Sequence, residues 1–248
     1  MMETKETVEK VVEFAQTETK TKIFRHDYPV SDELRKVMVS EVCRDFMMYA
    51  LDQYYAEYLP MLKEYVDEHH PREEKRQILI RNLFWWRILY DSSVKVGSNC
   101  IEDYISENHH WLSKRPILIS WLRECNRLIP KFYHVGYKYN DRVLVVTDIL
   151  TAKTLDVIVY DQSAIPPKKG EIVMGTLIPL GDGLFFPIID FYHFDFEARQ
   201  ELANHFFYYY DKCSKTSSMH EAFIHVLSSM LQIERLVFID HQENPSSR

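Results

Sequence analysis

The sequence contains little glycine: six residues in 248, of which only Gly181 and Gly183 lie close together. Phosphate-binding loops and dinucleotide-binding turns both require closely spaced glycines where a strand leads into a helix. Gly181 and Gly183 fit a hairpin turn better than a phosphate loop. The glycine content therefore excludes the P-loop and dinucleotide-binding classes.

Cysteine is also sparse, and its spacing excludes the common cysteine sites. The four cysteines stand at positions 43, 100, 125 and 213, so 57, 25 and 88 positions separate successive residues. No pair has the spacing of a zinc knuckle or of a redox CxxC motif. We expect buried, reduced thiols and no metal or other cofactor.

Long apolar runs and a targeting signal are missing from the sequence. The first 21 positions are polar and alternate in charge, unlike the apolar core of a secretory signal. The longest apolar runs, near position 85, are interrupted by Asn82 and Arg87 and are too short to span a bilayer. We therefore expect a cytoplasmic protein with no membrane partner. The formal net charge of −7 also makes nucleic acid an unfavoured partner, because the field of the whole chain repels it.

A segment of β-type pattern, residues 131–190, stands between two regions of helical pattern. Runs rich in Val, Ile, Tyr and Phe alternate there with turn signals at Asn140-Asp141, Leu150–Lys153, Pro166–Gly170 and Gly181–Gly183. This alternation predicts about five short antiparallel strands. Because an open five-stranded sheet leaves two unpaired edges, we expect it to close into a small barrel, SH3-like or OB-like.

The expected fold class is α+β, a helical scaffold with the small β-barrel embedded before two C-terminal helices. The expected boundaries are a helical domain over 1–130, the barrel over 131–190, C-terminal helices over 191–240 and a disordered tail over 241–248. Within the first range, residues 1 to 22 predict a weak helix that docks or stays mobile.

The helix expected after Ser31 has a broad apolar face. Ser31 is a good N-cap, and Pro60 predicts that the helix ends or kinks near Glu57. One apolar series recurs every four residues from Leu34 to Tyr58. A second series lies beside it, formed by Val39, Cys43, Met47, Leu51 and Tyr55. Two adjacent stripes predict a helix that is packed on more than one side.

Capping signals and apolar periodicity predict the remaining helices. Asn99 and Ser218 are each followed three residues later by Glu, as in a capping box. Pro116 fits the first turn of another helix. Periodicity predicts two longer helices, over Glu73–Tyr90 and over Phe196–Lys212.

Acidic and histidine residues after the predicted barrel form the sharpest candidate for catalysis. Asp190, His193 and Asp195 lie within six positions of one another. In an extended chain, His193 and Asp195 project to one face, where they could share a metal ion or a proton. This pattern fits a metal-dependent hydrolase or nuclease. It also fits a barrel exit whose polar residues face water, which is the interpretation we favour.

Aromatic residues are abundant, with 16 Tyr and 14 Phe, and several fall in the predicted strands. Tyr137, Tyr139, Phe185 and Phe186 are the candidate binding residues, because small barrels can stack single-stranded bases on such rings beside a basic groove. Residues 131–190, however, hold six Lys and Arg against seven Asp and Glu. This near-neutral balance weakens the nucleic-acid interpretation and favours core packing for these rings.

The middle of the chain, Phe84 to Pro187, resembles a segment of uncharacterised bacterial proteins, chiefly of Gram-positive bacteria and their mobile elements. The resemblance lies in the order of FWWRILYD, CIEDYI, FYHV, VLVVTDILTAKTLDVIVYD and KKGEIVMGTLIPLGDGLFF. Some of those proteins continue into a C-terminal SEC-C zinc motif. The clustered CxC and terminal Cys-Cys or Cys-His ligands of that motif are missing from this sequence, so the resemblance implies a fold and no zinc site.

Sparse polar constellations and abundant aromatics favour a non-enzymatic protein-interaction or regulatory module of a bacterium or its mobile elements, with another protein as partner. A metal-dependent hydrolase or nuclease and a single-stranded nucleic-acid binder are the alternatives.

Overall fold

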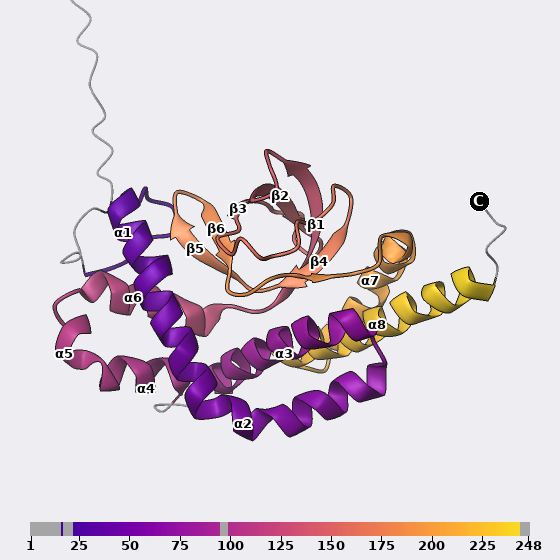
Figure 1. The fold of residues 1–248 in the computed structure, drawn as a ribbon, viewed down its shortest axis with the longest axis horizontal. Helices are drawn as coiled ribbons and strands as arrows, with labels where there is room; N and C mark the ends of the chain where they lie inside the picture. Colours follow the sequence, from indigo (N-terminus) through magenta and orange to yellow (C-terminus); the bar gives the residue numbers. More distant parts are fainter. Residues whose placement is uncertain (1–15, 17–21, 95–98, 244–248) are drawn as a thin grey trace, which may run out of the picture.

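The computed structural model describes residues 16, 22–94 and 99–243. A layer of helices lies against one side of a curled β-sheet (Figure 1). The chain forms most of the helices first, then the whole sheet, and then two long helices that return to the helical layer. The structure confirms an α+β protein, and every strand of the sheet except the last lies in the segment of β-type pattern. The weak helix predicted for residues 1 to 22 falls almost entirely outside the described residues.

The sheet has seven strands in the order β5-β6-β3-β2-β1-β4-β7. Neighbouring strands are antiparallel except β3 and β6, which are parallel. The expected closed barrel of five antiparallel strands is therefore wrong, and the sheet is a curled half-barrel. Its strands are β1 Lys131–Lys138, β2 Val143–Asp148, β3 Thr154–Ile158, β4 Ile172–Gly175, β5 Leu177–Gly181, β6 Leu184–Pro187 and β7 Tyr192–His193.

Two features of the chain keep the sheet from closing as predicted. Pairing changes partner at Thr176, because the residues before it pair with β1 and the residues after it pair with β6. The chain after β6 then adds a short strand, β7, beside β4. The two edges of the sheet are therefore β5 and β7, which do not pair with each other.

The edge strand β5 is covered by other parts of the chain. At the turn after β5, the Asp182 amide donates to the Tyr28 carbonyl at 2.9 Å. The fully buried Trp121 donates its indole N–H to the Pro179 carbonyl at 2.8 Å. These contacts use backbone groups of an edge that would otherwise be open to pairing with another chain.

The first helix is continuous over three segments, α1 Asp32–Lys36, the π-helical η1 Val37–Cys43 and α2 Arg44–His69. The Ser31 hydroxyl caps it, as predicted, by accepting from the Leu34 amide at 3.2 Å. Pro60 lies inside α2, so the helix does not end near Glu57. Figure 1 shows α2 changing direction along its length, as expected for a helix that is kinked at a proline.

The other helices agree with the predicted caps and differ in length. Both capping signals are confirmed: Asn99 Oδ1 accepts from two amides of the first turn, and Ser218 and Glu221 exchange hydrogen bonds. Asp91–Val94 continue the second long helix beyond the predicted end at Tyr90. The helices are α3 Glu73–Val94, α4 Cys100–Glu107, α5 His109–Leu112, α6 Pro116–Glu124, η2 Cys125–Arg127, η3 Phe196–Ala198, α7 Arg199–Ser214 and α8 Met219–Glu243.

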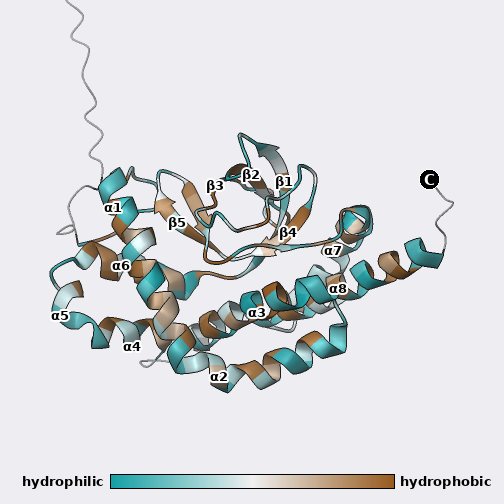
Figure 2. Ribbon diagram, in the orientation of Figure 1, coloured by the Kyte–Doolittle hydropathy of each residue, from teal (hydrophilic) through white to brown (hydrophobic). Residues whose placement is uncertain are grey.

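One large core joins the helices to the sheet, and a smaller core fills the curl of the sheet. The large core takes side chains from all three of the ranges 1–130, 131–190 and 191–240. The smaller core is built from Val135, Leu144, Val146, Val157 and Val173, among others. Figure 2 shows the hydrophobic stretches of α3 and α8 running beneath the sheet.

The last helix, α8, is long and apolar. It is the one helix among the described residues that is long and apolar enough to cross a membrane, by length and composition alone. Core helices of soluble proteins can be equally long and apolar, so these two properties do not establish that α8 spans a membrane. His241–Glu243 belong to α8, against the tail expected from 241, and residues 244–248 lie outside the described residues.

Candidate binding groove

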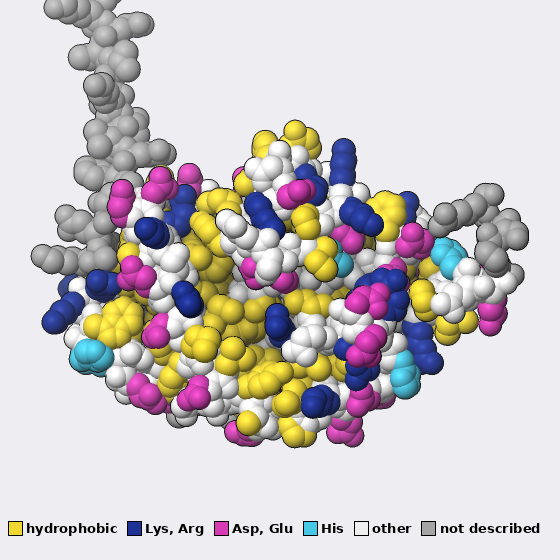
Figure 3. Space-filling model, in the orientation of Figure 1, with side chains coloured by type: hydrophobic (Ala, Val, Ile, Leu, Met, Phe, Trp, Pro, Cys, Tyr) yellow, Lys and Arg dark blue, Asp and Glu magenta, His cyan; other side chains and the backbone are white. Residues whose placement is uncertain are grey.

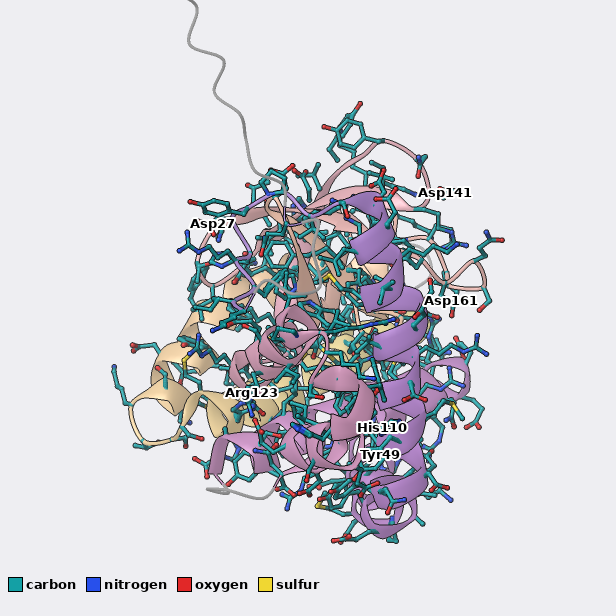
Figure 4. All side chains as sticks on the ribbon, turned by 90° about the vertical axis from the view of Figure 1, so that its left-hand side faces the viewer. Asp27, Tyr49, His110, Arg123, Asp141 and Asp161 are labelled. Atoms are coloured by element: carbon teal, nitrogen blue, oxygen red, sulfur yellow. The ribbon has the colours of Figure 1, made fainter. Side chains whose placement is uncertain are left out.

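A groove of about 710 Å³ lies between the first helix and the sheet. Its walls come from η1 and α2, from α3, from the loop after β3 and from the segment between β6 and β7. Fourteen of its eighteen lining residues are apolar: Val39, Cys43, Met47, Met48, Leu51, Tyr55, Phe84, Trp85, Val159, Tyr160, Phe186, Pro187, Ile188 and Ile189. Figure 3 shows hydrophobic side chains gathered across the middle of this face, and Figure 4 shows Asp161, a lining residue, beside the first helix.

The wall contributed by the first helix is the second apolar stripe that the sequence predicts. Val39, Cys43, Met47, Leu51 and Tyr55 all line the groove. The other stripe is buried in the core, so the helix has two apolar faces, as predicted, and the second one faces the groove. The stripe begins in the π-helical segment η1, and π-helical turns occur frequently at functional sites.

Three large apolar side chains at the groove remain open to solvent. Met48 is 61% exposed, Leu51 37% and Tyr160 43%. The Tyr160 ring lies edge-on to the buried Phe186 ring, with centroids 6.0 Å apart. Exposed apolar side chains that adjoin a hydrophobic groove indicate a binding surface rather than scattered surface residues.

The groove also carries two charges of each sign. Arg44 and Arg81 are exposed, while Asp161 and Asp190 lie on the sheet side. Burial, helped by the nearby Asp161 carboxylate, raises the pKa of Asp190 above its usual range. Hydrogen bonds from Ser163 lower the pKa of Asp161. The groove is therefore electrically balanced, with one carboxylate held in an unfavourable position.

The loop that carries Asp161 is fixed by Arg142, the residue directly before β2. Its guanidinium donates to the Ala164 carbonyl at 2.9 Å and to the Gln162 carbonyl at 2.5 Å. The Val159 amide donates to the Arg142 carbonyl at 2.8 Å. This wall of the groove is therefore held in place by the sheet.

The three predicted catalytic residues have different partners. Asp190 lines the groove, whereas His193 Nδ1 lies 3.1 Å from Glu171 and Asp195 Oδ1 lies 2.6 Å from Lys75 Nζ. The described residues contain no group of three or more His, Cys, Asp or Glu that could hold a metal ion. The geometry therefore lends no support to the metal-dependent hydrolase.

Asp195 belongs to a buried ion cluster that also contains Lys75, Glu234, Tyr192 and Arg72. Lys75 Nζ lies 2.6 Å from both Asp195 Oδ1 and Glu234 Oε1, and Tyr192 donates its hydroxyl to Glu234 at 2.7 Å. Burial raises the pKa of both Glu234 and Tyr192. The cluster joins α3, α8 and the segment after β7, and none of its residues lines the groove.

The four aromatic residues predicted to bind fall at three places. Tyr137 and Tyr139 are exposed together at the end of the β1–β2 hairpin. Phe186 lines the groove, and Phe185 packs against the smaller core inside the sheet. The sequence could not assign them, because their burial depends on strand register and on the helices that cover the sheet.

The thiols of the helical layer lack the environment of a nucleophile. Cys43 lines the groove but is 3% exposed, and burial raises its pKa to about 12. Burial raises the pKa of Cys100 to about 12 as well. A reactive cysteine instead has a lowered pKa and an accessible sulfur. These two thiols are therefore inert packing groups, as predicted.

No family model matches this sequence. No curated protein and no solved structure matches the chain.

Proposed function

We propose that the protein is a non-enzymatic binding module that takes an apolar segment of a partner protein into the groove. The observation that carries this proposal is the second apolar stripe of the first helix, Val39 to Tyr55, which lines an open groove. Val39, Met47 and Tyr55 are only partly buried there, and Leu51 is 37% exposed. Burying exposed apolar side chains against a partner is the main favourable term in protein association.

The lining of the groove suits a protein segment. Met47 and Met48 are unbranched and adaptable, and such side chains are common on surfaces that accept peptide side chains of varied shape. Arg44 and Asp190 supply both signs of charge, which suits the polar backbone and mixed side chains of a peptide. The resemblance in the middle of the sequence suggests that the partner belongs to a Gram-positive bacterium or to a mobile element.

Site-specific crosslinking tests this proposal. A photoreactive residue replaces Met48, at the groove, or Met61, which is 41% exposed on the same helix but does not line the groove. Both proteins are irradiated in cells of the native host, and the crosslinked peptides are sequenced by mass spectrometry. We expect position 48, and not position 61, to crosslink to one segment of another protein with several large apolar side chains.

A second measurement links the crosslink to affinity. The crosslinked segment, made as a synthetic peptide, should bind the purified chain, and M48E should weaken that binding at least tenfold while M61E leaves it unchanged. Equal crosslinking at both positions, a crosslink to a second copy of this chain, or a small molecule carried in the groove by the purified protein would each overturn the proposal.

A further inference from the structure

The end of the β1–β2 hairpin forms a second exposed surface, projecting above the rest of the sheet (Figure 1). Tyr137 and Tyr139 are 53% and 67% exposed there, and their ring centroids lie 5.0 Å apart with the planes at 82°. Figure 3 shows hydrophobic side chains at the top of the molecule, with Lys and Arg side chains nearby. Paired exposed rings are typical of a binding surface.

A bulge turns these rings outward. Tyr133 and Val135 face the interior of the sheet, so regular alternation along β1 would also place Tyr137 inside. The pairing with β2 shifts register between Val135 and Tyr137, and Tyr137 is exposed as a result. Bulges that redirect a side chain in this way are frequent next to functional sites.

A turn that carries two lysines lies against β1, two residues before Tyr137. The Gly170 amide donates to the Val135 carbonyl at 2.8 Å, which holds the turn before β4 against the middle of β1. Lys168 and Lys169, both exposed, are in this turn, and within the described chain neither side chain forms an ion pair. We call Tyr137, Tyr139, Lys168 and Lys169 the tyrosine–lysine surface.

The acidic and basic residues of 131–190 are nearly equal in number, but the fold places them at different parts of the sheet. Of the six basic residues in 131–190, three are at this end of the sheet: Lys138, which pairs with Asp141 at 2.9 Å, and Lys168 and Lys169, which are unpaired within the described chain. Arg142 instead binds the loop that carries Asp161. Only Asp141 and Glu171 of the seven acidic residues are here. Glu171 is buried and accepts from the Lys168 amide and from His193. The other five acidic residues lie along a strand, at other turns or in the groove: Asp148, Asp156, Asp161, Asp182 and Asp190. In Figure 4, Asp161 lies well below Asp141.

We infer that the tyrosine–lysine surface binds single-stranded nucleic acid. Every base has an aromatic face that stacks on an exposed ring, and lysines neutralise the phosphates between stacked bases. An acidic protein segment would use the lysines but would leave the two rings without a partner. This site is separate from the groove, so the inference does not depend on the proposed function.

Binding of short oligonucleotides tests the inference. The purified full chain is titrated into fluorescent dT12 and, in a separate arm, U12, at a physiological salt concentration, where the Debye length is about 8 Å and the rest of the negative chain is screened. The variants are Y137A/Y139A and K168S/K169S. Matched controls on α7 are Y208A, at a ring that is 64% exposed, and K212S/K215S, which makes the same change in charge.

Removing the tyrosines should weaken binding by roughly five- to a hundredfold per ring, the range measured for base stacking on aromatic residues. Removing the two lysines should reduce the dependence of log K on log salt by about 1.4, because each phosphate contact to a single strand contributes about 0.7. Controls should bind like the wild-type chain. Failure to bind either oligonucleotide, binding that the controls weaken equally, or binding of polyglutamate that also depends on Tyr137 and Tyr139 would overturn the inference.

Discussion

The buried ion cluster and the groove contain the same kinds of residue, yet one is closed and the other is open. In the ion cluster, Lys75 contacts two carboxylates, and a tyrosine hydroxyl uses a further oxygen of Glu234. In the groove, burial and the nearby Asp161 carboxylate disfavour the charge of Asp190, and the exposed side chains of Met48 and Leu51 line the same groove. Burial raises the pKa of Glu234 too, but its carboxylate keeps Lys75 and Tyr192 as partners, which indicates a structural role. The open, mostly apolar lining around Asp190 indicates a place for a partner.

The two regions also differ in what each joins. The ion cluster ties α3 and α8 to the segment after β7, which are elements far apart in the sequence. The groove separates the first helix from the β6–β7 segment over a hollow of about 710 Å³. Substitutions at contacts that join distant elements, such as the ion cluster, should therefore lower the free energy of unfolding. Substitutions in the groove should change that free energy little.

The largest effect is expected from Lys75→Met in the ion cluster. The substitution leaves Asp195 and the buried Glu234 without their shared cation, and an uncompensated buried charge costs about 3–5 kcal/mol. Urea unfolding measures the change. The matched control is Arg76→Met, which removes a more exposed ion pair with Asp67 and should cost no more than about 1 kcal/mol. A Lys75→Met protein as stable as the control would show that the cluster does not hold the layers together.

The next largest loss of stability is expected at the turn after β5, which is packed against the segment before the first helix. Gly181 has φ +87°, and a Cβ there would lie 2.6 Å from the Tyr28 carbonyl oxygen and would overlap Val30. Gly181→Ala should therefore destabilise the protein by about 2–4 kcal/mol, from backbone strain together with overpacking. Gly183→Ala is the control, because Gly183 also has positive φ but its Cβ would meet nothing within 4 Å.

The two alanine variants separate contact from backbone conformation. Gly183→Ala should cost only the strain of a left-handed backbone, about 1–2 kcal/mol. Thermal unfolding of both proteins, compared with the wild-type chain, gives the difference. Equal losses would mean that the segment before the first helix does not press on this turn, and the edge of β5 would then be less protected than the hydrogen bonds indicate.

The sequence predicts the local structure of this protein well, because local signals determine it. The caps at Ser31, Asn99 and Ser218 are confirmed, and the double stripe on the first helix correctly indicates a second apolar face. Side-chain periodicity and capping depend on neighbours a few positions away, so they can be read without knowing the fold.

Long-range pairing could not be predicted from the sequence. Nothing in residues 184–187 shows that they pair in parallel with β3, and the two residues of β7 are too few to form a recognisable pattern. The ion pairing of Asp195 could not be predicted either, because its partners Lys75 and Glu234 are 120 and 39 positions away. The charge at the hairpin end shows the same limit, since a count over residues 131–190 cannot tell which end of a sheet each residue occupies.

The smallest effects should come from the two carboxylates of the groove, and they should have opposite signs. Burial raises the folded-state pKa of Asp190 above its unfolded value, so the folded protein holds that proton more tightly. With respect to this group, stability is highest at low pH, falls as pH rises through the two pKa values and stays reduced above them. Asp190→Asn should therefore stabilise the protein at neutral pH, by no more than about 1 kcal/mol because solvent screens a half-buried group.

Asp161 is the matched control on the same groove, because Ser163 lowers its folded-state pKa. Its carboxylate contributes stability above the unfolded pKa, and the contribution is lost as pH falls through the folded pKa. Asp161→Asn should thus destabilise the protein slightly at neutral pH, and both variants should approach the wild-type stability when urea unfolding is repeated under acid conditions. If Asp190→Asn also destabilised the protein at neutral pH, the Asp190 carboxylate would be as well satisfied as those of the ion cluster. The groove would then be a structural contact between elements, like the ion cluster, and the contrast between the two regions would fail.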